Sequence, residues 1–120
     1  MNKNQRTAIA GIILALSNSG KVKNTYSYEL ASWTSLSGLA GDRTVTVYDH
    51  SRSCHISGRS NDGRRYSLYD YGMAGHISLT VDDKKASGYD YFSGSHFSAS
   101  VRGNSVSIYD YETCCHYNYS

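Results

Sequence analysis

One short phrase occurs four times in the last two thirds of the chain, and it constrains the fold more than any other feature. It reads Tyr-Asp-Tyr, or Tyr-Asp-His in the first copy, and a histidine follows six places after each aspartate. The copies recur every 20 or 21 residues, a period typical of proteins built from repeated supersecondary units. They are Tyr48-Asp49-His50 with His55, Tyr69-Asp70-Tyr71 with His76, Tyr89-Asp90-Tyr91 with His96, and Tyr109-Asp110-Tyr111 with His116.

Each repeat predicts a β-hairpin. Apolar and polar residues alternate up to the aspartate, as in Val106, Ser107 and Ile108, and they alternate again from the histidine onward. This period of two indicates half-buried strands, and the short polar link between the two runs predicts a hairpin turn. If four residues close each hairpin, Tyr111 is expected to face His116 across the strands.

Side chains two apart on a strand share a face, so Val106, Ile108, Asp110, Tyr117 and Tyr119 are predicted to face the core. The opposite face then carries the aromatic and imidazole side chains of the phrase. A three-residue loop would shift the pairing by one and exchange the faces of the second strand. The predicted ligand-binding residues are Tyr48, Tyr69, Tyr71, Tyr89, Tyr91, Tyr109, Tyr111, His55, His76, His96 and His116.

The predicted fold is mainly β, with four β-hairpin repeats in a pseudo-four-fold ring over residues 45–120 and an N-terminal helical segment over residues 1–44 packing on them. The alternative is a β-solenoid stack, which would align the four aspartates as a ladder of like charges roughly 4.8 Å apart. The ring avoids that repulsion. It would also bring Cys54 and Cys115 into neighbouring repeats, whereas a stack would place them outside disulfide reach.

The N-terminal segment differs in kind from the repeats. Over residues 4–17 the apolar side chains Ile9, Ile12, Ile13 and Leu16 follow helical spacing, with Ala8, Gly11 and Ala15 as a second stripe of small residues. Gly20 is expected to end this helix. A helix apolar on two sides needs cover from the repeats or from another copy of the chain, so a homo-oligomer is a possible outcome.

The same segment allows a second interpretation. Lys3 and Arg6 precede an apolar run over residues 8–16, as in the signal peptide of an exported protein. The run is too short to span a bilayer, so no membrane span is predicted. Residues 25–40 are compatible with either a second helix or a short strand.

The aspartates and histidines of the phrase each allow a structural and a chemical role. Each aspartate precedes a turn and is expected to accept backbone N–H groups there; a residue copied in every repeat usually serves the repeat, so no catalytic residue is predicted. The histidines are expected to pack on tyrosines across the hairpin. Alternatively, His55, His76, His96 and His116 converge on an axis and bind Cu(II) or Ni(II), although no short H-x-H or C-x-x-C spacing supports a metal site.

Composition bounds the remaining possibilities. A chain of 120 residues allows one domain, and a net charge of +2 with basic residues spread through the turns does not favour nucleic acid as the partner. The three cysteines, Cys54, Cys114 and Cys115, are an odd number. Reduced thiols in a cytoplasmic protein are the default expectation, and a bridge between Cys54 and Cys115 in an exported protein is the alternative.

The repeated Y-D-Y/H phrase, followed by a turn and a second short strand, resembles small bacterial repeat proteins described as four-fold β-flower domains, over residues 45–120. The resemblance implies a fold and carries no activity or site residue. The expected function is a non-catalytic binding or assembly module without a cofactor, whose repeated Tyr, His and Ser surface binds a glycan or a protein partner. A metal-binding protein that uses the four repeated histidines is the alternative.

Overall fold

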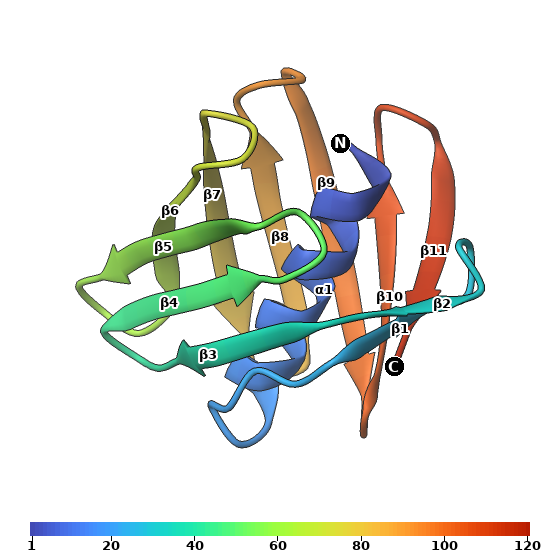
Figure 1. Cartoon of the computed structure of the whole chain (residues 1–120). Coiled ribbons are helices and arrows are strands. Elements are labelled where there is room, and N and C mark those ends of the chain that lie inside the picture. Colours follow the sequence, from blue (N-terminus) through green and yellow to red (C-terminus); the bar gives the residue numbers. More distant parts are fainter.

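A single antiparallel sheet curves around one helix. The computed structural model describes residues 1–120, and Figure 1 shows the helix α1 running along the inside of the sheet. The elements are α1 (Lys3–Ser17), β1 (Thr25–Ser27), β2 (Ser32–Thr34), β3 (Leu36–Ala40), β4 (Thr44–Asp49), β5 (Cys54–Ser60), β6 (Arg65–Asp70), β7 (Gly75–Asp82), β8 (Lys85–Asp90), β9 (Ser95–Arg102), β10 (Ser105–Asp110) and β11 (Cys115–Tyr119). The prediction of a mainly β protein with an N-terminal helix is confirmed.

The sheet is a nearly closed barrel. Its strand order is β2-β1-β11-β10-β9-β8-β7-β6-β5-β4-β3, so the two outermost strands, β2 and β3, are also neighbours in sequence and are separated only by Ser35. The carbonyl oxygen of Ser35 accepts a hydrogen bond of 2.9 Å from the backbone N–H of His50, at the end of β4. The strands therefore form one continuous wall around α1 and are not the successive rungs of a solenoid.

The four repeats form the hairpins β4-β5, β6-β7, β8-β9 and β10-β11, but the predicted register was wrong by two residues. His116 pairs with Tyr109, not with Tyr111, because the strand ends at Asp110 and Tyr111 is the first of four loop residues. A shift of two residues leaves every side chain on the same face. Accordingly Ile108 and Tyr119 are fully buried, as predicted.

Residues 25–40, which could not be assigned from sequence, form strands and add another hairpin. In β1 and β2, Tyr26 pairs with Trp33 as Tyr109 pairs with His116. The fourth loop residue, Ala31, has a φ of 51°. The same left-handed conformation occurs at the fourth loop position of the other four hairpins, at Ser53, Ala74, Gly94 and Cys114. The barrel therefore contains one hairpin more than the phrase predicted.

The helix is the centre of the hydrophobic core. Ile9, Ile12 and Ile13 are fully buried and belong to one apolar cluster with strand residues such as Val47 and Leu68. Side chains fill the interior of a barrel of about eight strands, and this wider barrel uses a helix to fill the additional volume. The cover that the two apolar sides of the helix require thus comes from the sheet of the same chain.

Both helix ends are capped by local hydrogen bonds. The Asn2 side chain accepts hydrogen bonds from the backbone N–H groups of Asn4 (2.9 Å) and Gln5 (3.3 Å), as an N-cap does. Gly20, the predicted stop, has a φ of 78° and donates its N–H to the Ala15 carbonyl oxygen at 2.7 Å. No helix in the structure has the length and hydrophobicity needed to cross a membrane.

The third repeat, strands β8 and β9, packs its part of the core differently from the others. Gly88 occupies the position that Leu68 and Ile108 occupy in other repeats, and its cross-strand partner is Phe97. A Cβ atom on Gly88 would lie 2.3 Å from the Phe97 Cζ atom and 2.3 Å from the Ser78 carbonyl oxygen. The phenyl ring therefore uses space that a larger residue at 88 would need.

This arrangement predicts the effect of adding one methyl group. We expect Gly88→Ala to lower the free energy of unfolding by more than about 2 kcal/mol, because backbone as well as side-chain atoms must move. Gly41→Ala is the matched control, since its added Cβ would be no closer than 3.8 Å to the Thr44 carbonyl oxygen. Urea denaturation of both variants measures the difference; an equal effect of the two substitutions contradicts the close packing.

Candidate functional site

Each hairpin of the four repeats carries the same group of aromatic rings on the outer face of the barrel. In each group a central tyrosine contacts the residue two places later and the histidine across the strands, with ring centroids 4.7 or 4.8 Å apart and interplanar angles of 61° to 83°. We call these groups the aromatic clusters. They are Tyr48, His50 and His55; Tyr69, Tyr71 and His76; Tyr89, Tyr91 and His96; and Tyr109, Tyr111 and His116.

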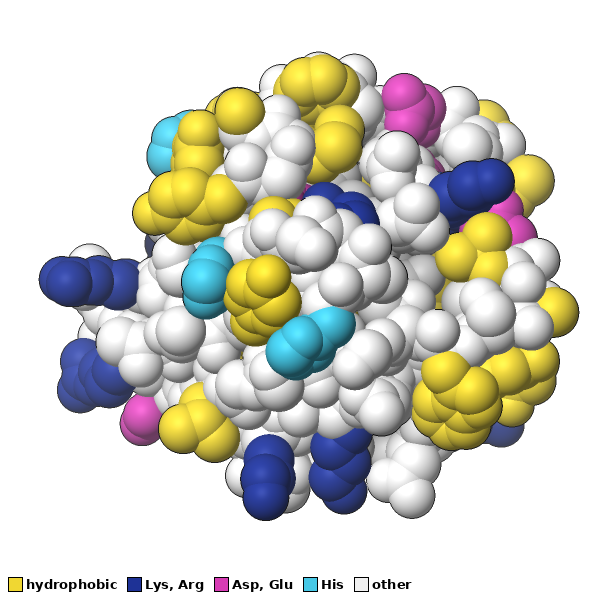
Figure 2. Space-filling view, in the orientation of Figure 1, with side chains coloured by type: hydrophobic (Ala, Val, Ile, Leu, Met, Phe, Trp, Pro, Cys, Tyr) yellow, Lys and Arg dark blue, Asp and Glu magenta, His cyan; other side chains and the backbone are white.

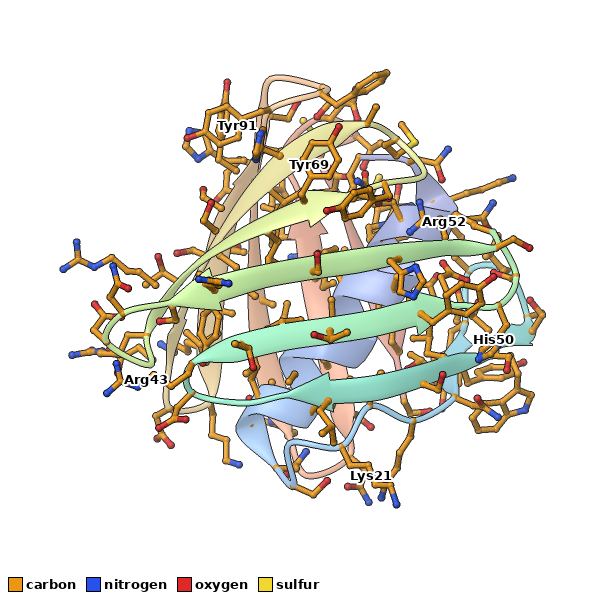
Figure 3. All side chains as sticks on the ribbon, turned by 60° about the vertical axis from the view of Figure 1, so that its left-hand side comes forward. Lys21, Arg43, His50, Arg52, Tyr69 and Tyr91 are labelled. Carbon is orange, nitrogen blue, oxygen red and sulfur yellow. The ribbon has the colours of Figure 1, made fainter.

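The geometry of a cluster fixes the central ring and exposes the outer one. Edge-to-face contacts on two sides are favourable and limit rotation of the central tyrosine. The outer tyrosines Tyr71, Tyr91 and Tyr111 are 61%, 63% and 54% exposed. Figure 3 shows Tyr69 and Tyr91 projecting outward from the sheet, and Figure 2 shows histidine side chains lying against hydrophobic ones on the surface over β4 and β5. The predicted ligand-binding residues thus share the outer face.

The N-terminal hairpin carries a related cluster that the motif search missed. Tyr26 lies 5.0 Å from Tyr28 and 5.3 Å from Trp33 between ring centroids, and Trp33 is 66% exposed. The phrase here is Tyr26-Ser27-Tyr28, and the cross-strand aromatic residue is a tryptophan. A search for two tyrosines flanking a small polar residue, with an aromatic residue six places after it, would have found this copy.

Shallow hollows separate neighbouring clusters. One, of about 530 Å³, lies between His55 of the first repeat and Tyr71 of the second, with Thr46, Ser53 and Ser57 beside them. Another, of about 380 Å³, lies between the Tyr89 and His96 pair of the third repeat and Tyr111 of the fourth. Serine and threonine hydroxyl groups line its floor at Ser78, Thr80, Ser87 and Ser98. Each hollow thus combines aromatic walls with hydroxyl groups.

The four histidines do not converge on an axis. The centre of the barrel is occupied by α1, and each histidine packs on its own tyrosine outside the sheet. No group of three or more His, Cys, Asp or Glu side chains in the chain is placed to hold a metal ion. The four imidazoles therefore do not meet at one site in this structure, because hairpin packing directs each of them outward. His50, which stands where the other repeats have the second tyrosine of the phrase, shares a hydrogen bond of 2.9 Å with the Ser37 hydroxyl group.

The aspartates of the phrase face inward and organise the loops. Asp49, Asp70, Asp90 and Asp110 are all fully buried. Each accepts the backbone N–H of the residue two places later, at distances of 3.0, 2.9, 3.1 and 3.0 Å respectively. The predicted structural role is confirmed: the carboxylates hold the loops that carry the outer aromatic residues.

Arg6 connects one of these carboxylates to the helix. Its guanidinium group donates to Asp110 Oδ2 (2.8 Å), to Glu29 Oε1 (2.9 Å) and to the Tyr119 hydroxyl oxygen (3.0 Å), and it lies 3.6 Å from the centroid of the Tyr117 ring. Burial alone would lower the pKa of Arg6, but these partners outweigh it and raise the pKa above its ordinary value. The group therefore remains cationic inside the barrel.

The other three aspartates differ in their partners. Arg52 bridges two of them, with Nε 2.7 Å from Asp49 Oδ2 and Nη1 3.0 Å from Asp70 Oδ2, and Gln5 of the helix donates to Asp70 Oδ2 at 2.9 Å. Asp90 has no cationic partner and accepts a hydrogen bond of 3.0 Å from the Ser93 hydroxyl group. The repeats are thus alike on the outside and different on the inside.

The three cysteines are all free, so the alternative bridge between Cys54 and Cys115 is not formed. Burial raises the pKa of the Cys54 thiol, which lies 4.0 Å from Asp70 Oδ1, although nearby Arg52 acts in the opposite direction. A raised pKa reduces the thiolate fraction near neutral pH and makes the Cys54 thiol a weak nucleophile.

No protein-family model, no curated protein and no solved structure matches this chain.

The unequal partners of the aspartates predict unequal effects of the same substitution. We expect Asp110→Asn to lower the free energy of unfolding by about 3 kcal/mol, because it leaves the buried Arg6 without its closest counter-charge. Asp90→Asn is the matched control and should cost less than about 1 kcal/mol, because an amide oxygen can still accept the Phe92 N–H. Chemical denaturation near neutral pH compares them, and similar losses would show that the ion pair contributes little.

Tyr119 predicts how stability depends on alkaline pH. Burial raises its pKa to about 12, although Arg6 acts to lower it; the ordinary value in an unfolded chain is about 10. Between these values the folded chain retains a proton that the unfolded chain has lost, so stability is complete below about pH 10 and falls as the pH approaches 12. Tyr119→Phe should show a shallower fall in denaturation experiments across this range. The exposed control Tyr28→Phe should retain the original slope, and an unchanged slope in Tyr119→Phe would contradict the assignment.

Proposed function

We propose that this protein is a non-catalytic binding module whose aromatic clusters bind polysaccharide at the loop end of the barrel. The observation that carries the proposal is the repetition of one outward-facing cluster, with the same strand register and the same ring contacts, in every repeat. We also propose that the hairpins of residues 45–120 are related to one another as in the four-fold β-flower domains that they resemble.

The chemistry of the surface suits sugars. A pyranose presents a flat patch of C–H groups that stacks on an aromatic ring, and hydroxyl groups at its edge that need donors and acceptors. The exposed faces of Tyr71, Tyr91 and Tyr111 supply the first requirement, and the hydroxyl-lined hollows beside them supply the second. Because each outer tyrosine already packs edge-on against its central tyrosine, part of its side-chain freedom is lost before binding.

Repetition favours a polymeric ligand. Each hollow is open and shallow, so a single site would bind weakly. Several equivalent sites on one rigid barrel raise the effective concentration of the next sugar once the first is bound, and overall affinity then exceeds that of any one site. This is the arrangement expected for binding a chain of repeating sugars in preference to a monosaccharide.

The positions of the carboxylates support a role without catalysis. The repeated aspartates face the interior, where they are used by loop N–H groups, Arg6, Arg52 and Gln5. Glycoside hydrolysis typically needs two carboxyl groups on either side of the scissile bond. Neither of the two hollows described above contains an aspartate or glutamate side chain.

Polysaccharide binding can be tested with outer tyrosines that the fold does not need. We expect the triple variant Tyr71→Ala, Tyr91→Ala and Tyr111→Ala to lose at least tenfold in affinity for a binding polysaccharide, and each single variant to lose about threefold, because avidity is lost with each site. A glycan array followed by isothermal titration calorimetry measures the effect.

The control is Leu39→Ala, which removes an equally exposed apolar side chain (64%) outside the aromatic clusters. Unchanged binding by the triple variant contradicts the proposal. So does selective capture of peptides and not glycans on parallel arrays, which would assign the surface to a protein partner.

A further inference from the structure

Strand β1 closes the barrel wall against the end of the chain, where the Tyr26 backbone N–H donates to the Ser120 carbonyl oxygen at 2.7 Å. Strand β1 pairs with β11 at a single register position, Ser27 with Tyr119. On the side of this contact away from the loops, a cavity of about 240 Å³ lies between the end of α1, the segment leading into β1, and the turn between β9 and β10. Its lining residues are Gly11, Leu14, Ala15, Asn18, Ser19, Lys21, Lys23, Asn24, Thr25, Trp33, Asn104 and Ser120.

The lining of this cavity combines apolar surface with positive charge. Leu14, Ala15 and the indole ring of Trp33 supply apolar surface. Lys21 and Lys23 are two places apart in an extended segment and so share a side. Neither lysine forms an ion pair, since every salt bridge in the structure involves other residues. No aspartate or glutamate side chain lines the cavity, and the terminal carboxylate of Ser120, a lining residue of the 120-residue chain, is the one anionic group beside the two lysines.

Most of the remaining polar side chains already have partners within the chain, and the NH₂ group of Asn24 is the exception. The Asn24 side-chain oxygen accepts the Leu36 N–H at 3.1 Å, which leaves the NH₂ group of Asn24 without a partner. The Asn18 side chain donates to the carbonyl oxygens of Leu14 (3.0 Å) and Gly103 (3.2 Å) and so fixes the helix end to the opposite wall. The cavity thus places the ammonium groups of Lys21 and Lys23 and the unpaired NH₂ group of Asn24 beside apolar surface.

We propose that this cavity binds a small aromatic carboxylate. The two lysines outnumber the single terminal carboxylate and favour an anion, and the flat Trp33 ring and the apolar side chains of Leu14 and Ala15 favour a planar ring. A cavity of about 150 Å³ in another protein accommodates benzene, so 240 Å³ leaves room for a ring together with its carboxylate group. Trp33 belongs both to the N-terminal aromatic cluster and to the rim of this cavity. The site is otherwise separate from the proposed polysaccharide surface.

Benzoate and its neutral analogue benzamide are suitable probes. Calorimetric titration of the 120-residue chain should show benzoate binding at least tenfold more tightly than benzamide. Trp33 is the only tryptophan, so a change in its fluorescence on binding reports from the rim of the cavity. Lys23→Met and Lys21→Met should each weaken benzoate binding at least threefold and leave benzamide binding unchanged. Lys85→Met, which removes a lysine that does not line the cavity, should change neither.

Three results would overturn the proposal: equal affinity for benzoate and benzamide, full affinity in the folded Lys21→Met and Lys23→Met variants, or no binding of benzoate, 1-naphthoate or cyclohexanecarboxylate at millimolar concentration. The triple tyrosine variant separates this site from the polysaccharide surface. It should retain benzoate binding, whereas Lys23→Met should retain polysaccharide binding, so either proposal can fail alone.

Discussion

The rest of the structure depends on the hydrogen bonds and ion pairs that the buried guanidinium group of Arg6 forms. This group is 2% exposed and donates to a strand carboxylate, to Glu29 in the loop between β1 and β2, and to the hydroxyl group of Tyr119 in β11. These partners lie on both sides of the contact between β1 and β11. A buried cation without such partners would cost several kcal/mol. The contact that fixes the helix inside the barrel therefore also holds the first and last hairpins together.

The repeated phrase contributes side chains to both faces of the barrel wall. Because neighbouring residues on a strand point to opposite faces, its aspartate reaches the interior while its tyrosines stand outside. The interior partners vary, from Arg6 at Asp110 to a lone serine hydroxyl group at Asp90. The exterior contacts scarcely vary. This separation lets the surface chemistry change without disturbing the loops, as His50 in place of a tyrosine illustrates.

The hairpins and the faces of their strands could be predicted because their pattern repeats, whereas the register and the N-terminal hairpin have no such signal in the sequence. Period-two alternation predicted the hairpins and their faces, and the position of the aspartates before turns predicted their role. The register was wrong because the left-handed residue that ends each loop is a glycine only at Gly94, so the loop boundary has no common signature. The N-terminal hairpin was missed because Ser27 and Trp33 replace the diagnostic aspartate and histidine, and because its second strand, Ser32–Thr34, is only three residues long. The position of the helix inside the sheet depends on contacts such as that of Arg6 with Asp110, 104 residues apart, which local pattern does not report.

The strands that cover α1 are synthesised after the helix itself. Residues of α1 leave the ribosome first, whereas Val106, Ile108 and Tyr119, which help to cover them, leave last. The apolar side chains of the helix therefore remain without these covering strands until residues 106–119 have been synthesised. Such a topology makes folding a late event that follows translation, and it makes the nascent chain a natural client for chaperones that shield apolar helices.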